Sequence, residues 1–211
     1  MAGPEQTSAT GEEVELRDGS TIVIRPLEPS DSELLADQFD RLCDESRRRR
    51  YLAPAARLSP EDLAALTAVD HKRHDALMAL DPDGRAIGIA RYVRTQGDPT
   101  TAEAAVEVVD EWHRRGVASA LLRRLHERAR ANGIEHYSAV VSDDNKVMLE
   151  GLERAGARRM PSDQPGELEF SVDVPSEGVG EGIILPALRA AASGQLSLAS
   201  SVVRKLLVWR R

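Results

Sequence analysis

The hydrophobic positions along the chain follow two spacings, one typical of strands and one typical of helices. Short runs of β-branched or small apolar residues that stop at a turn signal indicate strands. Apolar residues three and four positions apart indicate helices. The expected strands cover residues 20–25, 76–80, 86–93, 101–109, 136–141 and 168–174. The expected helices cover residues 30–43, a segment from residue 59, 116–131 and 145–155. This βααβββαβαβ order predicts an α+β (mixed α/β) domain.

Capping and turn residues sharpen several of these boundaries. Ser30, with Glu33 three positions later, predicts a capping box at the start of the first helix. Ser59 before Pro60 predicts the start of the second helix, because proline is favoured at the first helical position. The Asp-Pro-Asp-Gly sequence at 81–84 predicts a turn, so the strands on either side of it should form a hairpin.

The pattern also divides the chain into a domain and its flanking segments. Residues 1–13 are small, polar and acidic, and are expected to be disordered. The domain covers residues 14–174, and a linker rich in Pro, Gly and Glu follows at 175–182. Residues 183–211 predict an amphipathic helical tail that mixes apolar and basic positions. Docking of this tail on its own domain or on a second copy, which would form a homodimer, is favoured over contact with a membrane surface.

Composition narrows the class of protein. Aromatic residues are 3% of the 211 positions and the net charge is −7, which argues against base stacking and nonspecific DNA binding. The single cysteine, Cys43, excludes an internal disulfide and a thiolate zinc cage, and its place on an apolar stripe predicts a core position. No apolar run is long enough for a membrane span and no signal peptide is visible, so a cytoplasmic protein without nucleic-acid or membrane partners is expected.

Two further clusters carry less weight. His71 and His74 lie three apart beside acidic residues, but no third ligand is evident and no metal site is expected. The arginine run at 47–50 is typical of a solvated face, with guidance of an anionic substrate or partner as the alternative.

The stretch that predicts chemistry is AEAAVEVVDEWHRRGVAS, residues 102–119. A strand leads into a short basic loop, then Gly116, then a helix. The exposed N–H groups of a helix start bind anions, and glycine allows a ligand close to the backbone. Arg114 and Arg115 add positive charge, so the segment predicts a cradle for a phosphate or pyrophosphate. It is neither a P-loop nor a dinucleotide-binding glycine loop.

The charge changes sign at this junction. The acidic residues before the loop are Asp98, Glu103, Glu107, Asp110 and Glu111. The arginines after it are Arg114, Arg115, Arg123, Arg124, Arg128 and Arg130. This order predicts a ligand with its phosphates toward the helix and its reactive end beside the acidic strand, where a cationic amine would be the second substrate.

Two motifs in this order resemble the GCN5-related N-acetyltransferase (GNAT) superfamily. His-Arg-Arg-Gly-Val-Ala at 113–118 is similar to its acyl-CoA motif, [QR]xxGx[GA], and residues 145–157 are similar to the NxxAxxLYxxxGF segment. The resemblance extends over about residues 16–174, and is greatest to actinobacterial protein lysine acetyltransferase-like members. It implies a central, mostly antiparallel sheet with splayed strands, flanked by helices. It also implies transfer of an acetyl group from acetyl-CoA to a primary amine, with a small molecule or a protein lysine as acceptor.

The resemblance implies a cofactor site as well. Val108 and Val109 would pair with the pantetheine arm through their backbone, and Asn145 would contact the same arm. The remaining cofactor-binding residues, with the pyrophosphate on the N–H groups of 114–119, would be His113, Arg114, Arg115, Gly116, Val117, Ala118 and Ser119. His113 stands where the family usually has Gln or Arg.

For catalysis, the resemblance favours Glu103 as the general base that deprotonates the amine, with Glu107 in reserve. The two are four apart, so they share a face of an unbulged strand. A backbone N–H near Val108 would stabilise the oxyanion. Leu152 replaces the Tyr that serves as general acid in many members, so that role is unassigned. Together with His113, this substitution motivates the alternative of a catalytically weak acyl-CoA-binding regulatory module.

Overall fold

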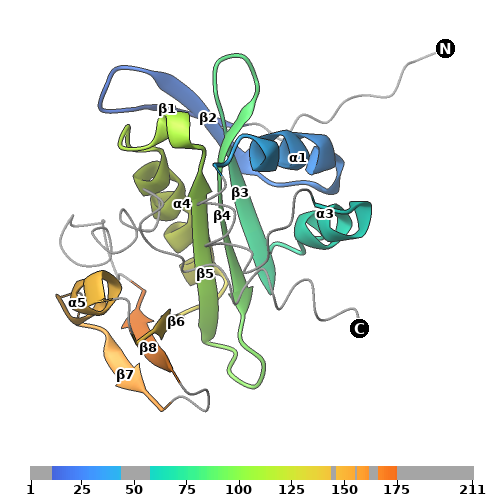
Figure 1. Ribbon diagram of the computed structural model, residues 1–211. Coiled ribbons are helices and arrows are strands. Elements are labelled where there is room, and N and C mark those ends of the chain that lie inside the picture. The colour runs from blue at the N-terminus through green and yellow to red at the C-terminus, as the bar shows by residue number, and fades with distance from the viewer. Residues whose placement is uncertain (1–10, 44–57, 144–145, 155, 162–165, 175–211) are drawn as a thin grey trace.

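The computed structural model of the chain describes residues 11–43, 58–143, 146–154, 156–161 and 166–174 (Figure 1). Its strands are β1 (Glu12–Glu15), β2 (Thr21–Pro26), β3 (His74–Leu80), β4 (Ala86–Arg94), β5 (Thr101–Val108), β6 (His136–Ser142), β7 (Arg158–Met160) and β8 (Glu167–Asp173). Its helices are α1 (Ser32–Asp40), α3 (Pro60–Thr67), α4 (Val117–Ala131) and α5 (Lys146–Arg154), with 3-10 turns η1 (Pro29–Asp31) and η2 (Asp110–Trp112). The predicted linker, tail and arginine run, and Asn145, lie outside the described residues.

The eight strands form one sheet in the order β1-β2-β3-β4-β5-β6-β8-β7. Every neighbouring pair is antiparallel except β5 and β6, which are parallel. The mixed α/β class and the mostly antiparallel sheet predicted from the sequence are therefore confirmed. Among the described residues, no helix is both long and apolar enough to cross a bilayer.

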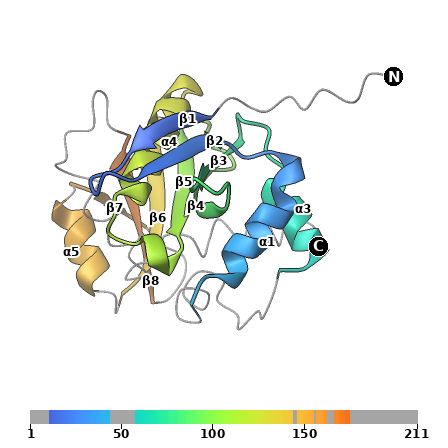
Figure 2. The ribbon, with the colours of Figure 1, turned by 90° about the horizontal axis from the view of Figure 1, so that it is seen from above.

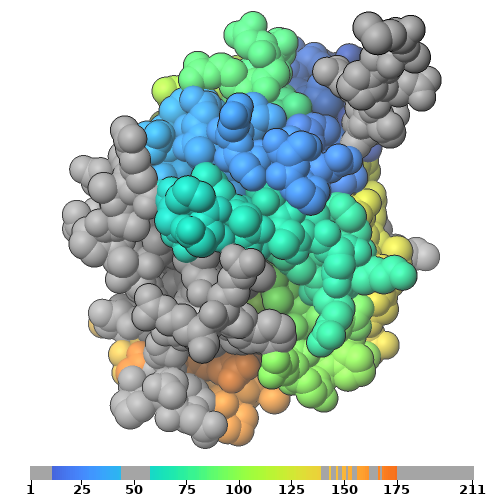
Figure 3. Space-filling view, turned by 90° about the vertical axis from the view of Figure 1, so that its right-hand side faces the viewer, coloured from blue at the N-terminus to red at the C-terminus, as the bar shows by residue number. Residues whose placement is uncertain are grey.

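Helices cover both faces of the sheet. α4 packs on β3, β4 and β5 from one side, whereas α1 and α3 lie against each other on the opposite side (Figures 1 and 2). The surface view from that side shows α1 and α3 together over the sheet (Figure 3). Gly88 on β4 lets α4 approach closely, because a Cβ there would lie 3.0 Å from the Glu107 carbonyl oxygen and 3.1 Å from Leu121 Cδ1.

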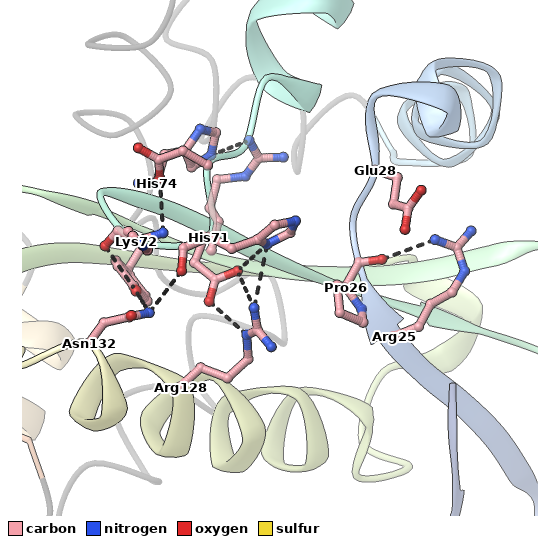
Figure 4. Close-up of polar contacts among 12 residues, drawn as sticks. Arg25, Pro26, Glu28, His71, Lys72, His74, Arg128 and Asn132 are labelled. Carbon is pink, nitrogen blue, oxygen red and sulfur yellow. Dashed lines mark hydrogen bonds and ion pairs between the residues drawn. The ribbon is translucent and has the colours of Figure 1, made fainter. Parts of the chain in front are cut away.

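A buried ion pair fixes α4 to β3. Asp75 is fully buried, and Arg128 of α4 donates from Nε to one of its carboxylate oxygens at 2.7 Å and from Nη2 to the other at 3.1 Å. The imidazole Nδ1 of His71 lies 2.9 Å from the same carboxylate. Asn132, which caps the end of α4, donates to the His71 carbonyl and to the Tyr92 hydroxyl (Figure 4). These bonds fix the end of α4 that is remote from the predicted phosphate cradle.

Most predicted elements are confirmed within a few residues, and the corrections are local. The short edge strands β1 and β7 were missed, because three or four residues give too little alternation. The disorder expected for residues 1–13 is wrong at Glu12 and Glu13, which pair with β2. The Ser59 capping box forms as predicted. The Ser30 box does not, because the Asp31 carboxylate instead accepts from the Glu28 N–H at 2.8 Å.

The expected core position of Cys43 is also wrong. α1 ends at Asp40, and Cys43 lies exposed beyond it. Its backbone N–H donates to the Asp110 carboxylate at 2.8 Å, and its Sγ lies 3.4 Å from the other oxygen of that group. The chain leaves the apolar stripe of α1 at this point and is tied to the loop that follows β5.

Candidate active site

The sheet opens between its two parallel strands. β5 and β6 pair only at the first three positions, Thr101 with His136, Ala102 with Tyr137 and Glu103 with Ser138. Beyond Glu103 both strands continue, β5 to Val108 and β6 to Ser142, without a further pair. The splayed strands implied by the family resemblance are therefore present. We call the space between residues 104–108 of β5 and 139–142 of β6 the strand gap.

The pairing of β5 with β4 decides which backbone groups face this gap. The Val109 N–H donates to the Ile87 carbonyl at 3.0 Å, and the Thr95 N–H donates to the Thr101 carbonyl at 2.8 Å. Because antiparallel bonding alternates, the odd-numbered residues of β5 bond to β4 and the even-numbered residues direct their N–H and C=O toward β6. Val106 and Val108 therefore present backbone groups to the gap.

Val109 does not fit the role expected for it. Its N–H is bonded to Ile87, and its carbonyl accepts from the Trp112 N–H at 2.9 Å. Both backbone groups are thus used within the chain, and the expectation that Val109 pairs with pantetheine is not supported. Val106, two positions before Val108, takes its place by strand alternation. Periodicity alone could have suggested this residue, once Val108 was placed.

The loop at the open end of the gap adopts the conformation that a helix-start anion site needs. After η2, Arg114 has a left-handed φ of 61° and Gly116 a φ of 107°. Gly116 is the N-cap of α4, and the nearest atom to a Cβ built there is Leu16 Cδ2 at 3.9 Å, so open space lies before it. The first N–H groups of α4, at Val117 and Ala118, have no acceptor one turn earlier in the helix.

Side chains of the loop have unequal roles. His113 Nε2 donates to the Val108 carbonyl at 2.9 Å, so this ring fixes the loop against the strand end. Arg115 forms an ion pair with Asp18 and stacks on Trp112, with its guanidinium carbon 3.8 Å from the ring centre. Arg114 is exposed and forms no ion pair with any described residue. Of the loop cations predicted to face a phosphate, Arg114 is therefore the one not committed to the fold.

Glu103 and Glu107 lie on one face of β5, as predicted, because the register with β4 is unbroken between them. That face lies under α1 and α3, and both carboxylates are buried, with 5% and 7% of each residue exposed. The arginine-rich helix α4 covers the other face. The side chains of the acidic strand and of the basic helix therefore lie on opposite faces of the sheet, and the single ligand expected to span from the helix start to the strand stays a prediction. Two arginines of α4, Arg124 and Arg128, pair with acidic side chains of the fold.

A glutamine that the sequence analysis missed contacts the reserve base. Gln38 on α1 is fully buried, and its Nε2 donates to a Glu107 carboxylate oxygen at 3.3 Å. Gln38 lies with Leu35 and Phe39 on the buried face of α1. A polar residue inside an apolar stripe is the signal that could have found it.

Three further residues considered in the sequence analysis, Leu152, His71 and His74, take part in the packing and hydrogen bonding of the fold. Leu152 on α5 is buried in the apolar core, where no acid function is available. His71 and His74 bond to Asp75 and to the Ala68 carbonyl, so both rings have partners within the fold. The described residues contain no group of three or more His, Cys, Asp or Glu side chains arranged to hold a metal.

A mostly antiparallel sheet that opens between two parallel strands, with a glycine-capped helix start at the opening, defines an acyltransferase of the GNAT class. The chain belongs to the acetyltransferase (GNAT) family, whose family model matches residues 38–157. It is 32% identical over 136 residues to Acetyltransferase PA5475 of Pseudomonas aeruginosa, which covers 63% of this chain and 73% of that relative.

Two further matches are to acetyltransferases of the PAT type. Acetyltransferase Pat of Mycolicibacterium smegmatis is 31% identical over 166 residues, 77% of this chain, and the chain spans about half (48%) of that relative. The crystal structure of the GNAT domain of S. lividans PAT has a TM-score of 0.67 and 32% identity, and the match covers 80% of this chain and 99% of that domain. The predicted likeness to actinobacterial protein acetyltransferase-like members is therefore confirmed.

Proposed function

We propose that this acetyltransferase binds acetyl-CoA in the strand gap and transfers the acetyl group to a primary amine, a protein lysine being the acceptor we favour. The observation that carries the proposal is the opening of the sheet beyond Glu103, with the start of α4 at its mouth. The printed names of the relatives support the reaction class. The acceptor is taken from the resemblance, noted in the sequence, to protein lysine acetyltransferase-like members.

The residues present fit this cofactor. By strand alternation, Val106 directs its N–H and C=O groups toward β6, and Val108 directs its N–H there while its carbonyl accepts from His113; an amide-bearing arm in the gap would meet these groups. The N–H groups at the start of α4, together with Arg114, would hold the pyrophosphate. Asn145, which lies outside the described residues, stays a predicted contact to the arm. The cofactor would supply a thioester whose carbonyl carbon bonds to the amine as the carbon–sulfur bond breaks.

Residues of this chain would carry the protons and the charge. Glu103 stands at the last paired position, where the gap begins, and Glu107 stands four residues nearer the loop. A lysine-like amine has a pKa of about 10.4, so the general base must remove a proton from it before it attacks the thioester. We assign that step to Glu103. The Val108 N–H would donate to the developing oxyanion.

The alternative is an acyl-CoA-binding regulatory module with weak turnover. It is favoured by Leu152, which is buried in the apolar core and cannot protonate the thiolate that departs. Because a thiol has a pKa of about 8.5, a general acid for the thiolate is helpful rather than essential. We therefore favour the acetyltransferase over the regulatory module.

Titration calorimetry with acetyl-CoA, followed by acetyl transfer to lysine peptides and small amines, separates these hypotheses. We expect binding and transfer. Binding without transfer to any amine would favour the regulatory module, and absence of binding would refute both. The cytoplasmic location and the homodimer through residues 183–211 stay predictions from the sequence.

A further inference from the structure

A buried arginine lies on the same face of the sheet as the two glutamates. Arg91 on β4 is 2% exposed and pairs in register with Ala105, the residue midway between Glu103 and Glu107. Diagonal neighbours on adjacent antiparallel strands lie about 7–8 Å apart, within reach of long side chains. Ala105 is small and leaves space above it for the arginine side chain. A buried cation thus stands one diagonal step from each carboxylate.

The partners of Arg91 show where its charge is directed. Nη1 donates to the Leu66 carbonyl at the end of α3 at 2.9 Å and lies 3.5 Å from His74 Nε2. His74 pairs with Val93, which in turn pairs with Glu103, so these three residues form one row across the sheet. These two contacts draw Nη1 of Arg91 toward the row that contains Glu103.

His74 holds this charge without neutralising it. Its Nδ1 lies 3.1 Å from the Ala68 carbonyl, which can only accept, so Nδ1 carries the proton and Nε2 presents a lone pair to Arg91. Burial, reinforced by the positive charge of Arg91, lowers the pKa of His74 to about 4. The ring is neutral at pH 7 and lies on the opposite side of the sheet from Arg128 (Figure 4).

We propose that Arg91 is a positioning residue of the reaction: held by His74 and the Leu66 carbonyl, its charge keeps the buried Glu103 ionised and ready to accept a proton. Burial alone disfavours a charged carboxylate, and a nearby cation opposes that effect. This inference rests on the proposed role of Glu103 as general base.

Several further groups face Glu103 or its neighbours from the packed elements of the described part of the chain. β3 contributes neutral His74, β5 contributes the like-charged Glu107, and β6 contributes Ser138 at the paired position. α1 contributes the uncharged Gln38. The acidic residues of α3, Glu61 and Asp62, lie in its first turn, at the opposite end from Leu66.

The test compares Arg91→Gln, which removes the charge at similar length, with Arg91→Lys, which keeps it. In Arg91→Gln, the acidic limb of the kcat/KM pH profile should move up by at least about one pH unit, while the acetyl-CoA Kd stays within about twofold of wild type. In Arg91→Lys the limb should stay closer to wild type. An unmoved limb in a folded Arg91→Gln protein would overturn the inference.

A second measurement needs neither activity nor an Arg91 variant. Carboxyl ¹³C NMR of the wild-type protein, with the Glu103 resonance assigned by its loss in Glu103→Gln, follows the ionisation of this group directly. The midpoint should lie below pH 6, and a midpoint above pH 7 would contradict the inference. If Glu103→Gln keeps full turnover, the proposed base is wrong. If instead the NMR midpoint alone is high, only the role of Arg91 is wrong.

Discussion

At the scale of single residues, the two buried glutamates of β5 differ in what surrounds them. Glu103 stands where β5 leaves β6 and lies in the row toward which Arg91 is held. Glu107 accepts from Gln38 under α1. Both share one face, but only Glu103 combines the start of the gap with a nearby buried cation. This difference makes the two residues separable by experiment.

Glu103→Gln should lower kcat by at least about 100-fold, because the amide keeps the shape of the side chain and removes the base. Glu107→Gln is the matched control on the same strand face and should lower kcat by less than about tenfold. Steady-state acetyl transfer with each variant, alongside calorimetric acetyl-CoA affinity, checks both. Equal turnover in Glu103→Gln and wild type would remove Glu103 from the mechanism.

Arg114 holds a left-handed backbone without being a glycine, and such strain costs roughly 1–2 kcal/mol. Arg114→Gly should leave the free energy of unfolding unchanged or raise it by up to about 1 kcal/mol, since glycine relieves strain but adds freedom to the unfolded chain. Arg115→Gly should lower it, because the Asp18 ion pair and the Trp112 stack are lost. Urea unfolding of both variants measures the two free energies of unfolding. A larger loss of stability in Arg114→Gly than in Arg115→Gly would show that the backbone of Arg114 is not strained.

At the scale of elements, α4 is positioned by contacts at both of its ends. Gly88 allows close packing on β4, and the Arg128–Asp75 pair fixes the C-terminal turns. The N-terminal turn, with Gly116 as its cap, is thereby presented at the mouth of the strand gap. The placement of the proposed phosphate cradle therefore depends on packing remote from it.

Arg128→Met should lower the free energy of unfolding by about 3 kcal/mol, because it leaves the Asp75 carboxylate buried without its arginine. Arg124→Met is the control on the same helix. Its ion pairs with Glu12 and Glu127 lie at the surface, so its cost should stay within about 1 kcal/mol. Chemical denaturation of both variants tests this, and similar costs would show that the buried pair does not stabilise α4.

The elements also show how far the sequence could predict the site. The strand, loop, glycine and helix at 101–131 could be located, because periodicity and a helix-start glycine are local signals. The direction of side chains across the sheet could not. The position of Arg91 beside Glu103 depends on strand register. Glu107 meets Gln38 only because α1 folds over a strand 69 positions away in sequence. The change of charge at Arg114 predicts one ligand across this junction, but it could not show that the glutamates of β5 and the arginines of α4 lie on opposite faces of the sheet.

At the scale of the whole molecule, stability should depend on pH through two buried histidines. Burial lowers the pKa of His126 to about 4, and burial together with Arg91 does the same for His74. The ordinary pKa of a histidine is about 6.5, so between about pH 4 and pH 6.5 the unfolded chain binds more protons than the folded chain. The contribution of each histidine to the free energy of unfolding is therefore fully present above about pH 6.5. It is lost as the pH drops toward 4, by roughly 3 kcal/mol for each histidine.

Urea unfolding of wild type and His126→Gln at pH 7 and pH 4.5 measures this dependence. His126 is the better choice because it lies on the buried face of α4, bonded to the Tyr137 hydroxyl, on the opposite face of the sheet from Glu103. The variant should lose less stability than wild type over that interval. Identical losses would mean that His126 already titrates normally in the folded protein.

The central claim is that the strand gap and the start of α4 form the acetyl-CoA site, and hydrogen exchange tests it most directly. Exchange of backbone amides, measured by mass spectrometry with and without saturating acetyl-CoA, should slow in segments 104–109 and 114–119. Strand β2, on the far side of β3, should exchange at an unchanged rate. Unchanged exchange in both segments despite calorimetric binding, or slowing confined to other elements, would contradict the account.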